Sequence, residues 1–160
     1  MSRYSTVKEG AMTPDSGPES WVVHLLRAVT IEANLLGTEF AAANDLHVTD
    51  LRAIIELLDA ERAGRIATPT WLGEQLRLNS ASVTALIDRL ERMGHVRRER
   101  DPIDRRRVLL AVTPTAKQLG LAFFGPLIGR IIQAMTEFGP AETETIHRFL
   151  SRMITEIRAV

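Results

Sequence analysis

The chain has 160 residues, of which 45% are hydrophobic and 25% are charged, so it can form one domain with a substantial core and is not a disordered polymer. It contains no cysteine, which excludes disulfides, thiolate metal sites and redox chemistry at a thiol. Its 20 basic and 20 acidic side chains give a formal net charge of zero, which argues mildly against a nucleic-acid partner and makes the distribution of charge the more informative property.

The N-terminal segment, residues 1–18, is polar and shows no apolar periodicity, so we expect a disordered arm or one that a partner orders. It lacks the apolar stretch of a signal peptide, and no apolar run reaches the roughly 20 residues that span a bilayer. A soluble cytoplasmic protein without a membrane partner is therefore expected, with residues 19–160 forming its single domain.

Apolar residues recur at helical spacing in the first two elements of this domain. The first helix is expected to begin near Ser20, a plausible N-cap, and to run to about Phe40. Trp21 and Phe40 are more easily explained by core or dimer packing than by a ligand box. A second helix is predicted over residues 49–60, with Thr49 as a possible N-cap and an apolar stripe formed by Leu51, Ile54, Ile55 and Leu58.

Two closely spaced helices follow and form a helix-turn-helix pattern. Residues 65–67 could make a short strand, and Thr68 then caps a helix over residues 69–76 that has Pro69 at its first position. Gly73 in this helix permits the close approach of a neighbouring helix. After a three-residue connection, Asn79 or Ser80 caps a further helix that Gly94 terminates and whose buried stripe is Val83, Leu86, Ile87 and Leu90.

A basic hairpin is predicted directly after this helix. Two β-type runs, residues 96–100 and 107–112, flank a turn that carries the sequence Asp-Pro-Ile-Asp-Arg-Arg-Arg. Residues 77–107 contain nine Arg and five acidic side chains, a local excess of four positive charges. A helix that can fill the major groove, followed by a basic hairpin that can reach phosphates or the minor groove, suits a DNA duplex. Arg97, Arg98 and Arg107 either reach the DNA backbone or pair with acidic residues across the hairpin.

The C-terminal part is predicted to form two helices. Thr113 and Pro114 start a long helix in which Pro126 should produce a kink near Gly125, and a last helix runs from about residue 141 to the end of the chain. The apolar stripes of these helices and of the first helix are too extensive for a small lobe to cover. Dimerisation through them is therefore expected.

The outward face of the predicted recognition helix carries small residues. Ser82, Thr84 and Ala85 let the backbone come close to base edges, where a hydroxyl can donate or accept and a methyl group can touch thymine. Such a face reads sequence only weakly through direct hydrogen bonds. Arg89, nearer its edge, is expected to pair with a phosphate or to brace the wing; the alternative is an ion pair within its own helix, with Asp88 or near Glu91.

These segments resemble those of the MarR-family transcriptional regulators. The resemblance runs from about Leu46 to Thr113 and, in helix order, covers nearly the whole chain. It is carried by residues 78–84 (Leu-Asn-Ser-Ala-Ser-Val-Thr), 86–91 (Leu-Ile-Asp-Arg-Leu-Glu), 94–98 (Gly-His-Val-Arg-Arg), the turn 101–107 and the closing Val112-Thr113. The turn sequence is highly specific for this family.

The resemblance implies a mainly α fold with a small β-wing. It implies a winged helix-turn-helix lobe at residues 46–113 and dimerisation helices at residues 19–45 and 114–160. It further implies a homodimer that binds pseudo-palindromic double-stranded DNA. Family members are often repressors that small phenolic or other lipophilic ligands release from DNA.

The resemblance also implies roles for individual residues. A wing Asp that holds an Arg maps onto Asp104, and the Arg that enters the minor groove maps onto Arg106, with Arg105 as the next candidate. Many relatives have a long basic residue where Ala85 stands, which weakens the expectation of a specific guanine contact. The expected DNA-binding residues are Asn79, Ser80, Ser82, Thr84, Ala85, Arg89, Arg97, Arg98, Asp104, Arg105 and Arg106.

A ligand pocket of the family type would lie near Trp71, and His47 is either a donor in that pocket or a surface residue. No nucleophile–base pair, metal cluster or phosphate loop is recognisable, so we expect no cofactor and no enzymatic activity. The alternative to a DNA-binding regulator is a winged-helix protein-interaction module without specific DNA binding. The zero net charge and the modest recognition helix support that alternative.

Overall fold

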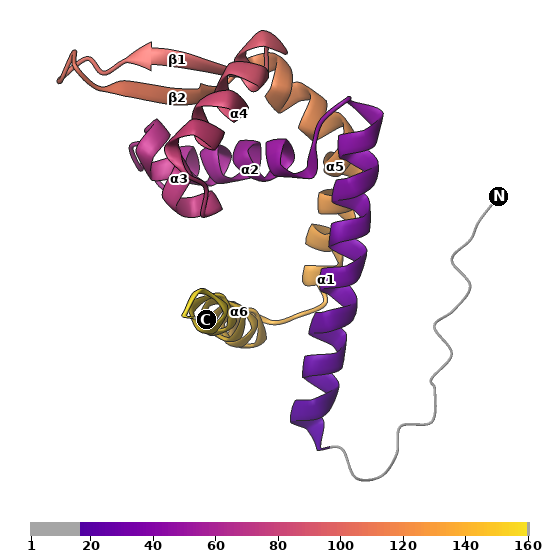
Figure 1. The fold of residues 1–160 in the computed structure, drawn as a ribbon. Coiled ribbons are helices and arrows are strands. Elements are labelled where there is room, and N and C mark those ends of the chain that lie inside the picture. The colour runs from indigo at the N-terminus through magenta and orange to yellow at the C-terminus, as the bar shows by residue number, and fades with distance from the viewer. Residues whose placement is uncertain (1–16, 160) are drawn as a thin grey trace. The chain divides into compact units, whose positions relative to one another are not determined.

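The computed structural model describes residues 17–159, which form six helices and a two-stranded antiparallel sheet (Figure 1). Their order is α1 (Pro18–Ala43), α2 (Val48–Arg62), α3 (Pro69–Leu76), α4 (Ser80–Arg92), β1 (Val96–Arg100), β2 (Val108–Val112), α5 (Pro114–Met135) and α6 (Pro140–Arg158). The predicted fold class, mainly helical with a small β-wing, is confirmed. The arm expected at residues 1–18 lies outside the described residues except for its last two. The described chain divides into two compact units, residues 17–55 and 56–159, and each is described by itself.

Three helices begin at capping residues that the sequence predicts. The capping bonds join Thr68 Oγ1 to the N–H of Trp71 (3.2 Å), Asn79 Oδ1 to the N–H of Ser82 (2.9 Å) and Thr113 Oγ1 to the N–H of Ala116 (3.2 Å). Each bond satisfies one of the backbone donors that a helix leaves unpaired at its first turn. Asn79, and not Ser80, is therefore the N-cap of α4.

The first two helices begin earlier than predicted. α1 begins at Pro18 after Gly17, so Ser20 lies in its first turn and is not its cap. α2 begins at Val48, and the carboxylate of Asp50 accepts a hydrogen bond from the N–H of His47 at 3.0 Å. A carboxylate at the third helical position can cap the helix start in this way, so Thr49 is not the capping residue.

The buried stripe of α2 is displaced from the predicted one. Leu57 is buried, whereas Leu58 is half-buried and Ile55 is exposed. Leu51 and Ile54 are buried as predicted, whereas the prediction for Ile55 and Leu58 is wrong, because adjacent apolar pairs at 54–55 and 57–58 allow two helical stripes. The buried members of this helix are Asp50, Leu51, Ala53, Ile54, Leu57 and Ala60.

Residues 65–67 form no strand, contrary to the prediction. The carbonyl of Ala67 nevertheless accepts a hydrogen bond from the N–H of Leu110 on β2, at 2.9 Å. One such bond does not make a ladder, but it attaches the segment before α3 to the edge of the wing.

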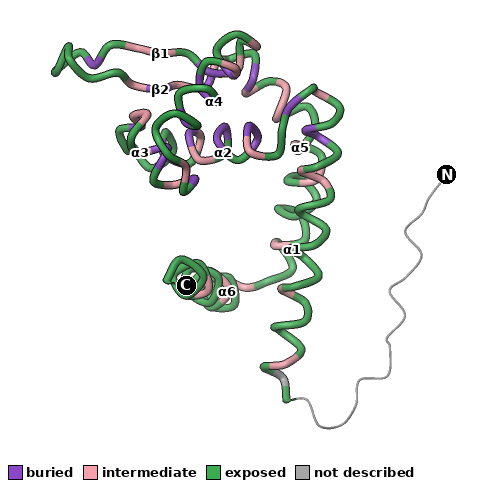
Figure 2. Tube along the Cα trace, viewed as in Figure 1, coloured by how far each residue is buried: buried purple, intermediate pink, exposed green. Residues whose placement is uncertain are grey.

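The two wing strands pair from Val96 opposite Val112 to Arg100 opposite Val108. The buried residues of the larger unit gather on α3, α4 and the base of this hairpin (Figure 2). The predicted buried stripe of α4, from Val83 to Leu90, is confirmed in full. A fixed core beneath α4 and the wing holds both elements in one lobe.

The long helices α1, α5 and α6 leave most of their apolar residues exposed. Ala116 is the one buried residue of α5, and the described part of α6 buries none. α5 continues through Pro126 as one helix, and the kink expected there stays a prediction. By length and composition α5 is also long and apolar enough to cross a membrane, contrary to the expectation that no apolar run reaches that length.

Candidate nucleic-acid interface

The turn between α3 and α4 brings the two helices into close contact. Arg77 takes a left-handed backbone conformation with φ of 55°, and the N–H of Leu78 donates to the carbonyl of Gly73 at 2.9 Å. A Cβ at Gly73 would lie 3.0 Å from a methyl group of Val83 and 3.3 Å from the carbonyl oxygen of Leu78. A larger residue would push α4 away, so the role predicted for Gly73 is confirmed.

The outward face of α4 is small and uncharged in its first two turns. Ser82 and Ala85 are exposed, and Thr84 is exposed with its hydroxyl donating to the carbonyl of Ser80 at 2.9 Å. That bond uses the hydroxyl proton within the helix and leaves the Thr84 oxygen as an acceptor. The side-chain oxygen of Asn79 accepts the capping hydrogen bond from Ser82, so the contribution of Asn79 to this interface is to fix where α4 begins.

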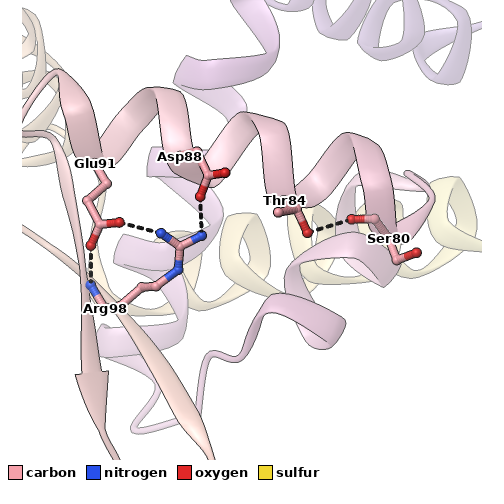
Figure 3. A network of polar contacts seen from close by, with 5 residues as sticks. All are labelled: Ser80, Thr84, Asp88, Glu91 and Arg98. Atoms are coloured by element: carbon pink, nitrogen blue, oxygen red, sulfur yellow. Dashed lines mark hydrogen bonds and ion pairs between the residues drawn. The ribbon is translucent and has the colours of Figure 1, made fainter.

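The second half of α4 is tied to β1 by an ion-pair network (Figure 3). The guanidinium of Arg98 pairs with Asp88 at 2.5 Å and also with the carboxylate of Glu91, and the N–H of Arg98 donates to Glu91 at 3.3 Å. The hydrogen bond that Arg98 donates to Asp88 raises the pKa of Arg98 above its ordinary value, although partial burial opposes the shift. Arg98, expected to bind DNA, therefore joins the wing to α4 through two carboxylates.

The other strand arginines also have acidic partners. Arg97 pairs with Glu99, two residues along β1, at 2.6 Å. The Nε of Arg107 lies 3.3 Å from a carboxylate oxygen of Asp101 at the start of the turn. Of the two alternatives for these residues, pairing with acids is the one that the structure displays. Only Arg107 pairs across the hairpin, since the partner of Arg97 lies on the same strand and the partners of Arg98 lie on α4.

The turn at residues 101–107 projects from the end of the hairpin (Figure 1). Arg105 and Arg106 are exposed there. The carboxylate of Asp104 accepts a hydrogen bond from the main-chain N–H of Arg106 at 3.1 Å. Asp104 thus orders the backbone at Arg106, while the acid next to a wing guanidinium is Asp101.

Four acidic residues that pair with arginines of this interface were not among the expected site residues: Asp88, Glu91, Glu99 and Asp101. Asp88 and Glu91 lie one turn apart on α4. The signal that could have indicated them is Arg98, a long cation near the start of the strand that follows this helix. Asp101 stands directly before a proline, a position where an aspartate often accepts hydrogen bonds from the backbone of its own turn. These acids are the partners of Arg97, Arg98 and Arg107, for which the sequence left both a DNA contact and an acidic partner open.

The expected ligand residues lie in different units. His47 is exposed at the start of α2, and Trp71 is half-buried with the guanidinium of Arg65 5.9 Å from its ring centre. A cleft of about 380 Å³ opens between α3 and α4, and its lining includes Pro69 and Thr84 but neither His47 nor Trp71. Among residues 17–159, no group of three His, Asp or Glu side chains is placed to hold a metal ion.

Comparisons with known proteins agree with this geometry. Residues 44–107 match the model of the MarR family. Over 134 residues the chain is 35% identical to the HTH-type transcriptional regulator YcgE of Bacillus subtilis (strain 168), a match that covers 84% of each protein. A MepR mutant from a multidrug-resistant S. aureus clinical isolate has a similar fold, with a TM-score of 0.69 at 18% identity over 85% of this chain and 96% of MepR.

The apo form of wild-type MarR from E. coli gives a TM-score of 0.52 at 21% identity, over 81% of this chain and 94% of MarR. Likeness at this identity shows the fold. The relative at 35% identity over most of both proteins shows more, and the family model covers the helix-turn-helix and most of the wing. The chain belongs to the MarR family of DNA-binding transcriptional regulators, which are not enzymes.

Proposed function

We propose that this regulator is a homodimeric repressor that binds a pseudo-palindromic operator and is released from it by a small lipophilic ligand. One observation carries the DNA-binding part: a capped helix with a small-residue outward face stands beside an ordered hairpin whose tip exposes Arg105 and Arg106. A family relative of this fold, S. aureus MepR, has been crystallised as a DNA complex.

In the proposed complex α4 enters the major groove. Its first turns allow close approach because Ser82 and Ala85 are small and exposed. A hydroxyl and a methyl group discriminate bases less sharply than a bidentate Arg or Asn does. We therefore assign α4 the fit to the groove and a modest share of the sequence readout, with Arg89 at the edge of this face.

The wing tip supplies the cationic contact. Arg106 enters the minor groove, and Arg105 lies next to it in the same exposed turn. A narrow minor groove concentrates negative potential and attracts a guanidinium without base-specific hydrogen bonds. Arg97 stays near the phosphate backbone and Asp104 keeps Arg106 in register.

Dimerisation uses the terminal helices. α1 exposes Leu25 and Val29, and α6 exposes Ile154 and Ile157, all of which are large apolar side chains. A water-soluble chain that exposes this much apolar surface is expected to cover it with a second copy. We assign residues 46–113 to the DNA-binding lobe and residues 19–45 and 114–160 to the dimer interface.

The ligand part rests on chemistry and on a relative. S. aureus MepR has been crystallised with ethidium bromide, a planar aromatic cation. Trp71 offers this chain an aromatic face that already lies near a cation, the guanidinium of Arg65. We assign Trp71 to a site for a small phenolic or other lipophilic molecule. His47, which lies in the other unit, is a separate and weaker candidate for a ligand contact.

Selection of bound duplexes from a random-sequence library tests this function. We expect two related half-sites about one helical turn, roughly 34 Å, apart, bound by a dimer. A small phenol, which unlike ethidium does not intercalate into the duplex, should lower the affinity for the selected duplex without unfolding the protein. A monomer in light scattering at micromolar concentration would contradict the dimer, and the absence of salt-dependent duplex binding would favour a protein-interaction module instead.

A further inference from the structure

Thr113 is the single residue between the wing strand β2 and the long helix α5. Its hydroxyl donates a hydrogen bond to the carbonyl of Gly94 at 2.7 Å and accepts one from the N–H of Ala116 at 3.2 Å. The N–H of Thr113 donates to the carbonyl of His95 at 3.0 Å. Thr113 therefore caps α5 and also binds the segment that follows α4.

That segment is itself fixed to the end of α4. The N–H of Gly94 donates to the carbonyl of Glu91 at 3.0 Å, and the N–H of His95 donates to the carbonyl of Leu90 at 2.9 Å. Gly94 has φ of 75°, a left-handed conformation that suits this kind of helix end. Leu90 is fully buried in the core of the lobe. The bonds from Thr113 therefore attach the start of α5 to the C-terminal end of the recognition helix.

Two further anchors of α5 also lie in its first turn. Ala116 is the one buried residue of this helix, and Nζ of Lys117 lies 2.5 Å from a carboxylate oxygen of Glu61 near the end of α2. About one turn further on, a Cβ added to Gly120 would meet no atom within 4 Å. The start of α5 is therefore fixed to the DNA-binding lobe, whereas its remainder is open to a second copy of the chain.

A small rotation at this junction would matter at the DNA. α4 has 13 residues and is therefore about 20 Å long. Ser82 and Ala85, which we assign to the major groove, lie towards the end of α4 that is far from Gly94. A rotation of about 10° around the Gly94 end would move the first turn of α4 by about 3.5 Å. That displacement equals the rise of one base pair, roughly 3.4 Å.

We propose that Thr113 is a positioning residue that sets the spacing between the two half-sites of the operator. It fixes α4 on the start of α5, so that two copies joined through their terminal helices present their recognition helices at one separation. Thr113 acts through Gly94 and touches no DNA itself. This proposal rests on the proposed function, in which a homodimer binds two half-sites.

A residue that only caps α5 would give a different result. Loss of a cap destabilises the fold, and it lowers the affinity for every duplex by the same factor. Loss of a fixed junction changes the ratio of affinities between duplexes that differ only in the length of the spacer between the half-sites. This ratio therefore separates positioning from stability.

The experiment measures Kd for the duplex that the wild-type chain enriches from a random library, and for two derivatives whose spacer is one base pair longer or shorter. Thr113→Val keeps the branched shape and removes both hydrogen bonds of the hydroxyl, whereas Thr113→Ser keeps the hydroxyl. Thr68→Val is the matched control: it removes a capping bond of the same length, 3.2 Å, from α3 of the same lobe. Among the described residues, the Thr68 hydroxyl binds no other element. Thermal melting checks that each variant is folded.

We expect the wild type to bind the two derivatives at least tenfold more weakly than the selected duplex, as for a mismatched position. Thr113→Val should lower this ratio about fivefold, as for the loss of a hydrogen-bonded group. Thr113→Ser should restore the ratio, and Thr68→Val should leave it unchanged. Lys117→Gln breaks an exposed ion pair, so it should fold readily and lower the ratio about twofold.

Three results would overturn the proposal: the wild-type ratio in Thr113→Val, an equal fall of the ratio in Thr68→Val, or a wild type that binds all three duplexes equally well. If Thr113→Val is unfolded, Lys117→Gln decides, and an unchanged ratio in that variant would overturn the proposal. If the wild type is a monomer or shows no salt-dependent duplex binding, the proposed function fails and this proposal fails with it. If the wild type binds as a dimer and discriminates between the spacers, but the variants discriminate equally well, this proposal alone fails.

Discussion

The outward face of α4 and the tip of the wing differ in charge and in how they are held. α4 presents small neutral residues in its first turns, and its two acids, Asp88 and Glu91, are paired with Arg98. The wing tip presents Arg105 and Arg106 on a turn that is exposed throughout except for its first residue. One element can approach DNA closely, and the other carries exposed positive charge.

This difference assigns two parts of DNA binding to two elements: α4 fits the groove, and the wing supplies electrostatic attraction to the DNA. Small side chains on a recognition helix allow contact but supply little electrostatic energy, whereas each Arg that replaces a counterion at a phosphate strengthens binding at low salt. The net charge of zero therefore does not weigh against DNA binding, because exposed arginines are concentrated in the wing turn, at one end of the lobe. The following variants test this division of roles, in order of decreasing expected effect.

Shortening the wing should cause the largest loss. Replacing residues 101–107 by Asn-Gly keeps a hairpin between β1 and β2, since this pair forms a tight two-residue turn, and removes Arg105, Arg106 and Arg107, the three exposed arginines of the turn. We expect affinity for the selected duplex to fall about a hundredfold at moderate salt, through the loss of two or more charged contacts. Binding within threefold of the wild type, measured by fluorescence anisotropy, would show that the wing is not the main source of attraction.

Adding a positive charge to the first turns of α4 should reduce the difference in charge between this helix and the wing tip. Ala85→Arg adds a long cation to an exposed position of the helix, and it should tighten binding roughly fivefold and raise the salt dependence by about one ion. Ala85→Gln is the matched control, because it adds a long side chain without charge. Equal effects from both variants would indicate that side-chain length, and not charge, limits the contribution of α4.

Breaking the ion pairs that join α4 to β1 should have the smallest effect, and this effect should be on the stability of the fold. Arg98→Ala should lower the free energy of unfolding by about 1 kcal/mol, since it breaks a partly exposed ion-pair network. Adding Asp88→Asn and Glu91→Gln should then change stability little further, which a urea-unfolding double-mutant cycle measures. Arg97→Ala, which loses a more exposed pair, is the control and should cost less. Fully additive effects would mean that Arg98 does not couple the wing to α4.

The helix-turn-helix and wing were predictable because their signals are local. Thr68, Asn79 and Thr113 each cap a helix through a bond three residues ahead, and Gly94 follows the end of α4. The apolar stripe of α4 has one periodic solution. In α2, by contrast, adjacent apolar residues such as Ile54 and Ile55 offer two solutions, and only packing decides between them.

The partners of the arginines could not be predicted in the same way. Arg98 meets Asp88 and Glu91 because β1 folds back along α4, and ten residues separate the cation from the first of these acids. The choice between Asp101 and Asp104 as the acid beside a wing guanidinium depends on the path of the turn, which the sequence pattern does not encode. The arginines in the sequence therefore predicted a DNA-binding surface, while the structure shows which of these arginines have acidic partners.

The salt dependence of binding by Arg106→Ala tests the central claim most directly. Kd for the selected duplex would be measured from low to moderate salt for the wild type, for Arg106→Ala and for Arg62→Ala, a control at the end of α2 that removes the same charge from an exposed ion pair. If Arg106 meets the DNA backbone or minor groove, its variant should bind more weakly and its slope of log K against log salt should be smaller by about 0.9, whereas the control keeps the wild-type slope. An unchanged slope and affinity in Arg106→Ala would contradict the assignment of the wing tip as the charged contact.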